Sequence, residues 1–150
     1  MRFPIKIDTV WTPFVLIGGA TRANSYVEVA DGEIIFCYGL LFRHRIPLDD
    51  VESIAPRKWP LWFGIGWRTN FMDMVGLIGS YDGVVEVKLR NRKRYWAVLG
   101  ARRISVSLED PEGFIEAVEQ ARSGGAKAKG EAKAKPKAKR TAKRKTKEQT

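Results

Sequence analysis

The sequence predicts a mainly β fold: a small antiparallel barrel of about seven to eight strands, capped by one C-terminal α-helix and followed by a disordered tail. Three observations carry this prediction. Short apolar or alternating segments recur at a spacing of roughly ten residues, and turn residues such as Asp31-Gly32 separate them. A single amphipathic segment then ends the globular part, and the composition changes abruptly near residue 124.

The expected strands are short segments limited by turn residues. Ser25–Ala30 alternates polar and apolar side chains before Asp31-Gly32, a two-residue hairpin signal, and Glu33–Tyr38 returns along it. Pro47 marks a strand end or edge because it cannot donate a ladder hydrogen bond. The segments with strand character are Val10–Ile17, Ser25–Ala30, Glu33–Tyr38, Leu40–Leu48, Asp49–Arg57, Met74–Gly79, Val84–Leu89, Arg94–Leu99 and Arg103–Leu108.

Two further features refine these strands. Side chains alternate along a strand, so Phe42, His44 and Ile46 are expected on one face and their arginine neighbours on the other. Asn91-Arg92-Lys93 is expected to form a turn between two strands.

One helix is expected at the end of the globular part. Asp110 suits the N-cap, Pro111 suits the first helical position, and Glu112 favours the N-terminal end of the helix dipole. Gly124-Gly125 is expected to end the helix. The side chains expected to face the core are those of Phe114, Ile115, Val118 and Ala121.

The connection RKWPLWFGIGWRTNFM, residues 57–72, is rich in aromatic residues. We expect no strand over Gly64–Thr69, and aromatic side chains that cover one end of the barrel. Gly64-Ile65-Gly66 lacks the third glycine, the preceding strand and the following helix of a phosphate loop. The alternative is a candidate lip that contacts a protein partner, formed by Trp59, Trp62, Phe63 and Trp67.

The net charge of +10 belongs to the C-terminal part of the chain. Residues 1–121 contain 15 Lys/Arg and 15 Asp/Glu, whereas residues 122–150 contain 12 Lys/Arg and two Glu. We therefore divide the chain into an N-terminal segment (1–9), a globular domain (10–123) and a basic tail (124–150). The tail has no apolar residue larger than Ala or Pro, so we expect it to be disordered.

The order of the elements is similar to that of bacterial pleckstrin-homology-like (PH-like) domains. The residues that carry the resemblance are Gly39, the corner from Ile46 to Ile54, Gly64–Trp67, Gly79-Ser80 and Ser107–Pro111, within residues 10–122. The resemblance implies a strand barrel closed by the helix. Eukaryotic relatives bind phosphoinositides through basic residues near the first hairpin loop, where this chain has Arg22 alone.

The tail resembles the Lys/Ala/Pro-rich tails of linker histones and actinobacterial nucleoid proteins. Such tails bind polyanions by releasing counterions, without reading sequence. The alternatives are a tail that only raises solubility and one that binds an anionic membrane surface. The expected polyanion-binding residues are Lys127, Lys129, Lys133, Lys135, Lys137, Lys139, Arg140, Lys143, Arg144, Lys145 and Lys147.

A second basic group lies within the domain. Antiparallel pairing would bring its members together beside Tyr95 and Trp96 as a candidate anion-binding edge; alternatively, the charges protect an edge strand from aggregation. The group is Arg90, Arg92, Lys93, Arg94, Arg102 and Arg103.

Residues suited to catalysis or metal binding are few. His44 is the one histidine and is expected in the core or at its rim, and the lone Cys37 is expected to be a small buried side chain in a reducing cytoplasm. The acidic segment Asp49–Glu52 reads as a solvated turn. We therefore expect no catalytic residue, metal or cofactor.

These observations predict a non-enzymatic binding module in the cytoplasm, associated with the nucleoid. The tail is expected to bind DNA or RNA, and the barrel to make protein contacts or bind an unidentified ligand. The second hypothesis is a peripheral adaptor on anionic membranes. No segment is expected to span a membrane, because the longest uncharged run, Thr9–Thr21, is short and contains Pro13 and two glycines.

Overall fold

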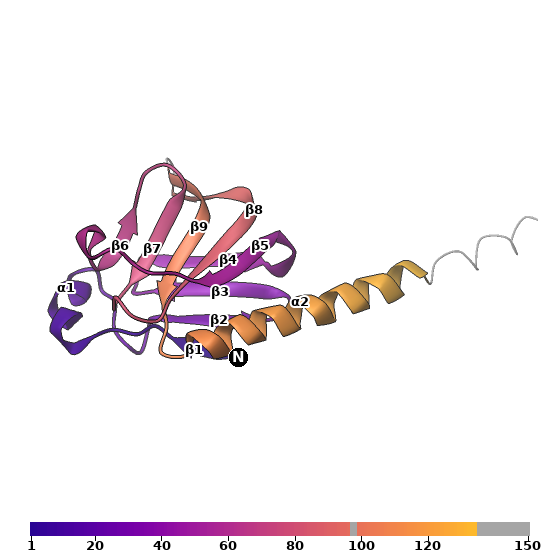
Figure 1. The fold of residues 1–150 in the computed structure, drawn as a ribbon, viewed down its shortest axis with the longest axis horizontal. Coiled ribbons are helices and arrows are strands. Elements are labelled where there is room, and N and C mark those ends of the chain that lie inside the picture. Colours follow the sequence, from indigo (N-terminus) through magenta and orange to yellow (C-terminus); the bar gives the residue numbers. More distant parts are fainter. Residues whose placement is uncertain (97–98, 135–150) are drawn as a thin grey trace, which may run out of the picture.

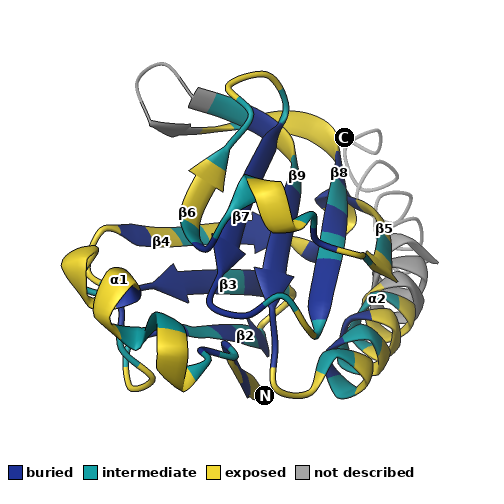
Figure 2. Cartoon of the chain, turned by 60° about the vertical axis from the view of Figure 1, so that its left-hand side comes forward, coloured by how far each residue is buried: buried dark blue, intermediate teal, exposed yellow. Residues whose placement is uncertain are grey.

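The fold is mainly β, as the sequence predicts, and consists of two sheets and a long C-terminal helix (Figure 1). The computed structural model describes the backbone of residues 1–96 and 99–134, and the side chains of residues 1–94 and 100–125. Figure 1 shows the strands of one sheet running across those of the other, and Figure 2 shows buried residues on the strands where the two sheets face each other.

The first sheet is antiparallel, in the order β1-β2-β3-β4. The hairpin at Asp31-Gly32 is confirmed: both residues have positive φ (53° and 76°), as a two-residue turn of this hand requires. The expected alternation along β4 is also confirmed, with Phe42 and Ile46 buried and Arg43 and Arg45 exposed. The strands are β1 (Arg2–Pro4), β2 (Tyr26–Ala30), β3 (Glu33–Tyr38) and β4 (Phe42–Pro47).

The second sheet is mixed, in the order β5-β8-β9-β7-β6. β7 runs parallel to β9 over Met74–Leu77, whereas the other pairs are antiparallel. This parallel pair departs from the wholly antiparallel fold expected from the sequence. The strands are β5 (Val51–Pro56), β6 (Gly66–Thr69), β7 (Met74–Ile78), β8 (Val84–Trp96) and β9 (Leu99–Ser107).

Within the described residues, the hydrogen-bond ladders do not close into a barrel. The sheets are joined by two isolated bridges, Ile5–Leu108 and Ile7–Gly79. Both bridges come from the segment after β1, so residues 1–9, expected from the sequence to be separate from the domain, contribute a strand and the connection between the sheets. Phe3, Ile5 and Ile7 of this segment are all buried in the core.

The hydroxyl of Ser107 holds this connection in place. Its Oγ donates to the carbonyl oxygen of Lys6 (3.0 Å) and accepts hydrogen bonds from the amides of Gly79 (2.8 Å) and Ser80 (3.3 Å). One buried side chain therefore joins the N-terminal segment, the end of β7 and the end of β9. Tyr38 adds a second contact between the sheets, because its hydroxyl donates to the carbonyl oxygen of Ile78 (3.2 Å).

α2 (Pro111–Ala134) covers one end of the space between the sheets. Phe114 and Val118 are fully buried, and the Phe114 ring meets the Phe3 ring edge-to-face at 5.4 Å. The helix contacts β2 and β5, one strand from each sheet. Asp110 acts at its start as expected, accepting a hydrogen bond from the amide of Gly113.

Four local predictions are wrong. Val10–Ile17 forms a 3₁₀ turn, η1 (Thr9–Trp11), and a short helix, α1 (Thr12–Ile17), because Pro13 fits the first helical turn and cannot donate to a ladder. Gly66–Thr69 is the strand β6, paired with β7. Two further 3₁₀ turns are η2 (Leu48–Asp50) and η3 (Leu61–Phe63).

The other two errors concern expected chain reversals. Asn91-Arg92-Lys93 lies inside β8, and the register shift between Lys88 and Lys93 shows that these residues make an irregularity rather than a turn. α2 continues through Gly124-Gly125, because the Ala, Lys, Arg and Glu residues around them favour helix enough to offset about 1 kcal/mol per glycine. The disorder expected for 124–150 therefore does not hold for 124–134, and residues 135–150 lie outside the described residues.

We expect Ser107→Ala to lower the free energy of unfolding by about 2–3 kcal/mol, since it leaves buried backbone groups without their partner. Ser105→Ala is the matched control: Ser105 is also fully buried in β9, and its Oγ has no hydrogen-bond partner among the described residues. Ser105→Ala should therefore change stability by less than about 0.5 kcal/mol or increase it. Urea unfolding of both variants tests this, and equal losses would contradict the assigned role of Ser107.

Candidate interaction surfaces

One end of the molecule exposes an unusual amount of apolar surface. We call it the apolar end and define it by five exposed large side chains, Phe14, Ile17, Leu40, Leu41 and Trp62, with the less exposed Trp67. Ile17 is 87 % exposed, Leu40 83 % and Trp62 82 %. Soluble monomers rarely expose so many large side chains together, so this end is a candidate interaction surface.

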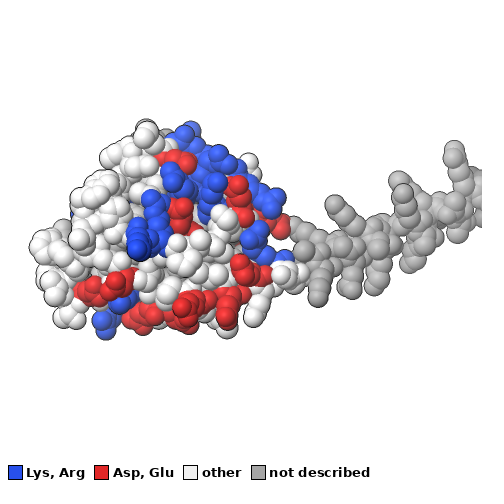
Figure 3. Space-filling view, viewed as in Figure 1, with Lys and Arg blue, Asp and Glu red and all other residues white. Residues whose placement is uncertain are grey.

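These side chains stand on four segments; one cavity joins Phe14, Leu41 and Trp67, whereas Trp62 lines a second one with Phe63 and Asn70. α1 carries Phe14 and Ile17, the turn between β3 and β4 carries Leu40 and Leu41, η3 carries Trp62, and β6 carries Trp67. Ring contacts connect the parts: Trp11 lies 5.8 Å from Phe14 and 6.1 Å from Tyr81, whose hydroxyl donates to the carbonyl oxygen of Leu61. In Figure 3 the left-hand side, where α1 and β6 lie in Figure 1, is mostly uncharged on the face in view, with acidic and basic side chains only along its lower edge.

Gly39 allows the β3–β4 turn to lie against the loop after α1. Its φ is +66°, and a Cβ at this position would come within 2.9 Å of the Ala20 amide nitrogen. The close approach places Leu40 over Gly19 and next to α1. A larger residue at 39 would push the turn and its two exposed leucines away from the helix.

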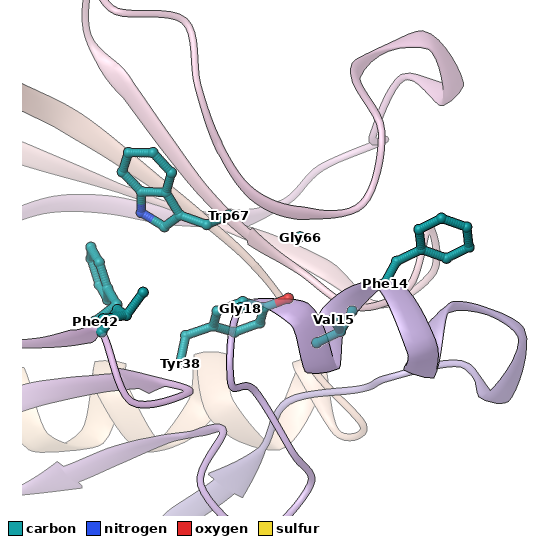
Figure 4. Close-up of a pocket in the computed structure, with 8 residues that line it drawn as sticks. Phe14, Val15, Gly18, Tyr38, Phe42, Gly66 and Trp67 are labelled. Atoms are coloured by element: carbon teal, nitrogen blue, oxygen red, sulfur yellow. The ribbon is translucent and has the colours of Figure 1, made fainter.

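A small cavity of about 170 Å³ opens at the apolar end (Figure 4). Phe14 and Val15 of α1, Tyr38 and Phe42 of the first sheet, and Trp67 of β6 line it. Figure 4 shows these side chains arranged around the space, with the Tyr38 ring at its base. The Tyr38 hydroxyl is engaged with Ile78, and its burial raises its pKa, so the walls are almost entirely apolar and uncharged.

The candidate lip of aromatic residues divides into a buried and an exposed part. Trp59 is only 6 % exposed, and its indole donates to the carbonyl oxygen of Gly64 (2.9 Å). Its ring lies against Gly76, where a Cβ would meet the indole at 2.7 Å. Phe63 is half-buried and contacts both Trp59 and Trp62 edge-to-face at 5.2 Å. Trp59 and Phe63 therefore support the exposed Trp62.

The segments that form the apolar end have a distinctive charge pattern. Residues 9–27, 36–48 and 57–72 contain six Lys/Arg and no Asp/Glu, although residues 1–121 as a whole are neutral. Arg45 and Arg57 pair with Glu33 and Glu86. Arg22, Arg43 and Arg68 are exposed and form no ion pair within the described residues. Arginines without acidic neighbours in sequence thus accompany the exposed apolar side chains.

The basic residues of the candidate anion-binding edge lie close together, as expected from the antiparallel pairing of β8 with β9. Arg102 donates to the carbonyl oxygen of Arg90 (3.0 Å), and Arg92 donates to that of Met72 (2.5 Å). Two members are already ion-paired: Arg103 with Asp73 at 3.5 Å and Lys93 with Asp50 at 2.9 Å. Arg90 and Arg94 remain exposed, and Figure 3 shows blue side chains interrupted by red ones around β8 and β9.

Asp50 is a buried structural carboxylate of this region. Its side chain is 8 % exposed, receives a hydrogen bond from the Asn91 amide (2.9 Å), and pairs with Lys93. Burial alone would raise the pKa of Asp50, but the contacts with Lys93 and Asn91 outweigh it and hold the pKa below its usual value. These contacts fasten η2 to β8 and explain why Asn91 and Lys93 stay within the strand.

The remaining sequence-predicted residues are placed as follows. His44 is half-buried on β4 with its ring 4.8 Å from that of Phe42, and Cys37 is buried. The described residues contain no group of three or more His, Cys, Asp or Glu that could hold a metal ion. Lys127, Lys129 and Lys133 lie on the last turns of α2, and the tail residues from Lys135 onward lie outside the described residues.

Sequence reasoning missed the contribution of α1 and of the β3–β4 turn to the apolar end. The available signals were Thr12-Pro13, which suits a helix start, and Leu40-Leu41 directly after a glycine turn. None of the helices in residues 1–96 and 99–134 is both long enough and apolar enough to cross a membrane. The chain matched no protein-family model, no curated protein and no solved structure.

Two substitutions test whether Trp59 belongs to the core and Trp62 to the surface. Trp59→Ala should lower the free energy of unfolding by about 3–5 kcal/mol because it empties a buried site. Trp62→Ala should change it by less than about 0.5 kcal/mol because the side chain lies in solvent. Thermal and urea unfolding measure both, and a large loss in Trp62→Ala would show that this residue belongs to the core.

The Asp50 contacts predict a pH-dependent contribution to stability. Because the folded-state pKa is lowered, the contribution is complete above the ordinary carboxyl pKa of about 3.9 and is lost as pH falls through the folded-state value. Asp50→Asn should therefore cost about 1.5–3 kcal/mol at pH 7, and the gap to wild type should narrow below about pH 4. Urea unfolding from pH 7 to 2.5 measures the gap, and a constant gap would contradict the role of the ionised carboxylate.

Proposed function

We propose that the protein is a non-enzymatic adaptor that binds nucleic acid through its basic C-terminal part and a second partner through its apolar end. The observation that carries this proposal is the separation of the two features. In Figure 1, α1 lies at one end of the long axis, and α2 leaves the body at the other end toward Ala134. With 24 residues, α2 is about 36 Å long at 1.5 Å per residue.

The charge distribution supports nucleic acid as the partner of the C-terminal part. Twelve of the 27 Lys/Arg lie in residues 122–150, beside only two Glu, and the segment has no aromatic residue to read bases. Binding is therefore expected to depend on phosphate contacts and counterion release, without sequence preference. The continuation of α2 through Lys127, Lys129 and Lys133 presents the start of this segment beyond the folded body.

The architecture is consistent with a PH-like binding module, and we propose this relationship as well. Two crossed sheets, a tight first hairpin and a C-terminal helix packed between the sheets support it. The parallel pairing of β7 with β9 is a departure from the expected antiparallel topology. An adaptor of this kind works in the cytoplasm at the nucleoid and needs neither catalytic residues nor a cofactor.

The nucleic-acid proposal is tested with full-length protein in which Lys127, Lys129, Lys133 and every Lys and Arg from residue 135 to residue 147 are replaced by Gln. Wild type should shift a short DNA duplex, and its affinity should fall by roughly 10³–10⁴ between 50 and 200 mM salt if about six to eight phosphates are contacted. The Gln variant should lose most of this affinity and most of the salt dependence. Parallel measurements with single-stranded RNA distinguish the two nucleic acids.

Arg90→Gln/Arg94→Gln is the matched control for the basic edge, since both residues are exposed outside the tail. It should bind DNA within about threefold of wild type. Equal binding by wild type and the tail variant would reject the proposal in favour of a solubilising tail, and a tail variant that loses anionic-vesicle binding but not DNA binding would favour a membrane role for the tail.

A further inference from the structure

We infer that the apolar end is a bilayer-docking surface that inserts its exposed aromatic and aliphatic side chains into the interface of an anionic membrane. This inference is independent of the basic tail and names the second partner of the proposed adaptor. It rests on three observations about the described residues: the shape of the apolar surface, its composition, and the absence of carboxylates from the segments that form it.

The shape suits a flat, deformable surface better than a peptide. The exposed side chains stand on separate short elements, namely α1, the β3–β4 turn, η3 and β6, and not along one helix or strand. The cavity between them is about 170 Å³ and is lined by apolar side chains, with room for little more than one side chain of a partner. A recognition groove for a helix or strand would extend over several residues.

The composition matches that of interfacial anchors. Phe14, Ile17, Leu40, Leu41 and Trp62 are all more than half exposed. Trp, Phe and Leu are the residues with which peripheral proteins enter the boundary between headgroups and acyl chains, to a depth of about 5–10 Å. Trp62 also rests on Phe63, which holds its ring in an outward position.

The arginine and lysine residues of the apolar end favour a bilayer with anionic headgroups. The three segments 9–27, 36–48 and 57–72 contain six Lys/Arg and no Asp/Glu, so no acidic residue in them opposes approach to a negative surface. Arg43 follows Phe42, a cavity residue, and Arg68 follows Trp67, and both arginines are exposed. Because side chains alternate along a strand, each arginine lies on the opposite strand face from the cavity residue before it, so the arginines would meet lipid phosphates beside the inserted apolar side chains.

The test is sedimentation of the full-length protein with two kinds of vesicle, phosphatidylcholine alone and phosphatidylcholine with about a third phosphatidylglycerol. It is done in the tail variant with Gln in place of the basic residues, so the tail cannot supply the attraction. This background should still bind the anionic vesicles, and more strongly than the neutral ones. Failure of DNA binding by the wild-type tail would leave this result unchanged, so the two proposals fail separately.

Two pairs of substitutions locate the binding surface. Ile17→Ser/Leu40→Ser should lower partitioning at least tenfold, since two large apolar side chains no longer enter the bilayer. Phe71→Ser/Met72→Ser is the matched control, because these residues are similarly exposed (78 % and 70 %) but lie on the β6–β7 turn, which closes the segment 57–72 and contributes none of the side chains that define the apolar end. It should bind within about twofold of its parent. Thermal unfolding confirms that both variants keep the fold.

A third variant tests the charge and the depth of insertion. Arg43→Gln/Arg68→Gln should reduce the preference for anionic over neutral vesicles and leave apolar insertion into neutral vesicles unchanged. Lipids brominated on the acyl chain should quench tryptophan fluorescence, and Trp62→Phe should remove a large part of that quenching.

Three results would overturn the inference. The first is no binding of the tail variant to anionic vesicles, and the second is an equal loss in Ile17→Ser/Leu40→Ser and in its control pair. The third is a wild-type dimer in sedimentation velocity that Ile17→Ser/Leu40→Ser converts to a monomer, because a second copy of the chain would then cover the apolar end.

Discussion

The hydroxyl of Ser107 links three segments that backbone hydrogen bonds also join, since the Lys6 amide donates to the Ser107 carbonyl oxygen and the Asp8 amide to that of Gly79. The two sheets do not share a continuous ladder within the described residues, so their relation depends on the short stretch after β1 and on side chains that cross between them. Ser107 binds the Lys6 carbonyl and the amides of Gly79 and Ser80, while Ile5 and Ile7 of the same stretch enter the core. Tyr38 makes the corresponding contact from β3 to Ile78.

This arrangement leaves two different ends. At one end, Phe114 and Val118 of α2 fill the space between the sheets, and the helix then leaves the body with its basic residues. At the other end none of the described residues forms a long helix over the sheets; α1 is six residues long and keeps Phe14 and Ile17 in solvent. The apolar end is thus a consequence of how the core is closed. In the cavity at this end, the hydroxyl of Tyr38 is hydrogen-bonded, and burial raises its pKa so that it stays neutral. The cavity is therefore suited to apolar contact and poorly suited to acid–base chemistry.

Features set by neighbouring residues could be predicted from the sequence. The Asp31-Gly32 hairpin follows from the positive φ that these residues tolerate, and the start of α2 follows from Asp110 and Pro111. The parallel pairing of β7 with β9 could not be predicted, because it depends on contacts between segments far apart in the chain.

The apolar end was missed for a related reason. An apolar segment such as Val10–Ile17 has the same composition whether it is a buried strand or an exposed short helix, and β-propensity depends on what the segment packs against. The exposure of Ile17 and Leu40 is a property of the whole arrangement, since it depends on where α2 packs and on how Gly39 brings the turn against α1. The aromatic connection was half predictable: its position after β5 was clear from the sequence, but its division into buried Trp59 and exposed Trp62 was not.

The continuity of α2 through Gly124-Gly125 has a consequence for the direction in which the helical part of the basic segment, up to Ala134, points. A helix turns by about 100° per residue, so the orientation of each later residue of α2 is fixed by the number of residues between it and the last residue packed on the body. Removing two residues near Gly124 would rotate the remainder of α2 by about 200° around the helix axis, whereas removing seven would return it to nearly the same direction and shorten the helix by about 10 Å. The helix therefore sets both the distance and the rotational angle between the folded body and the last turns of α2.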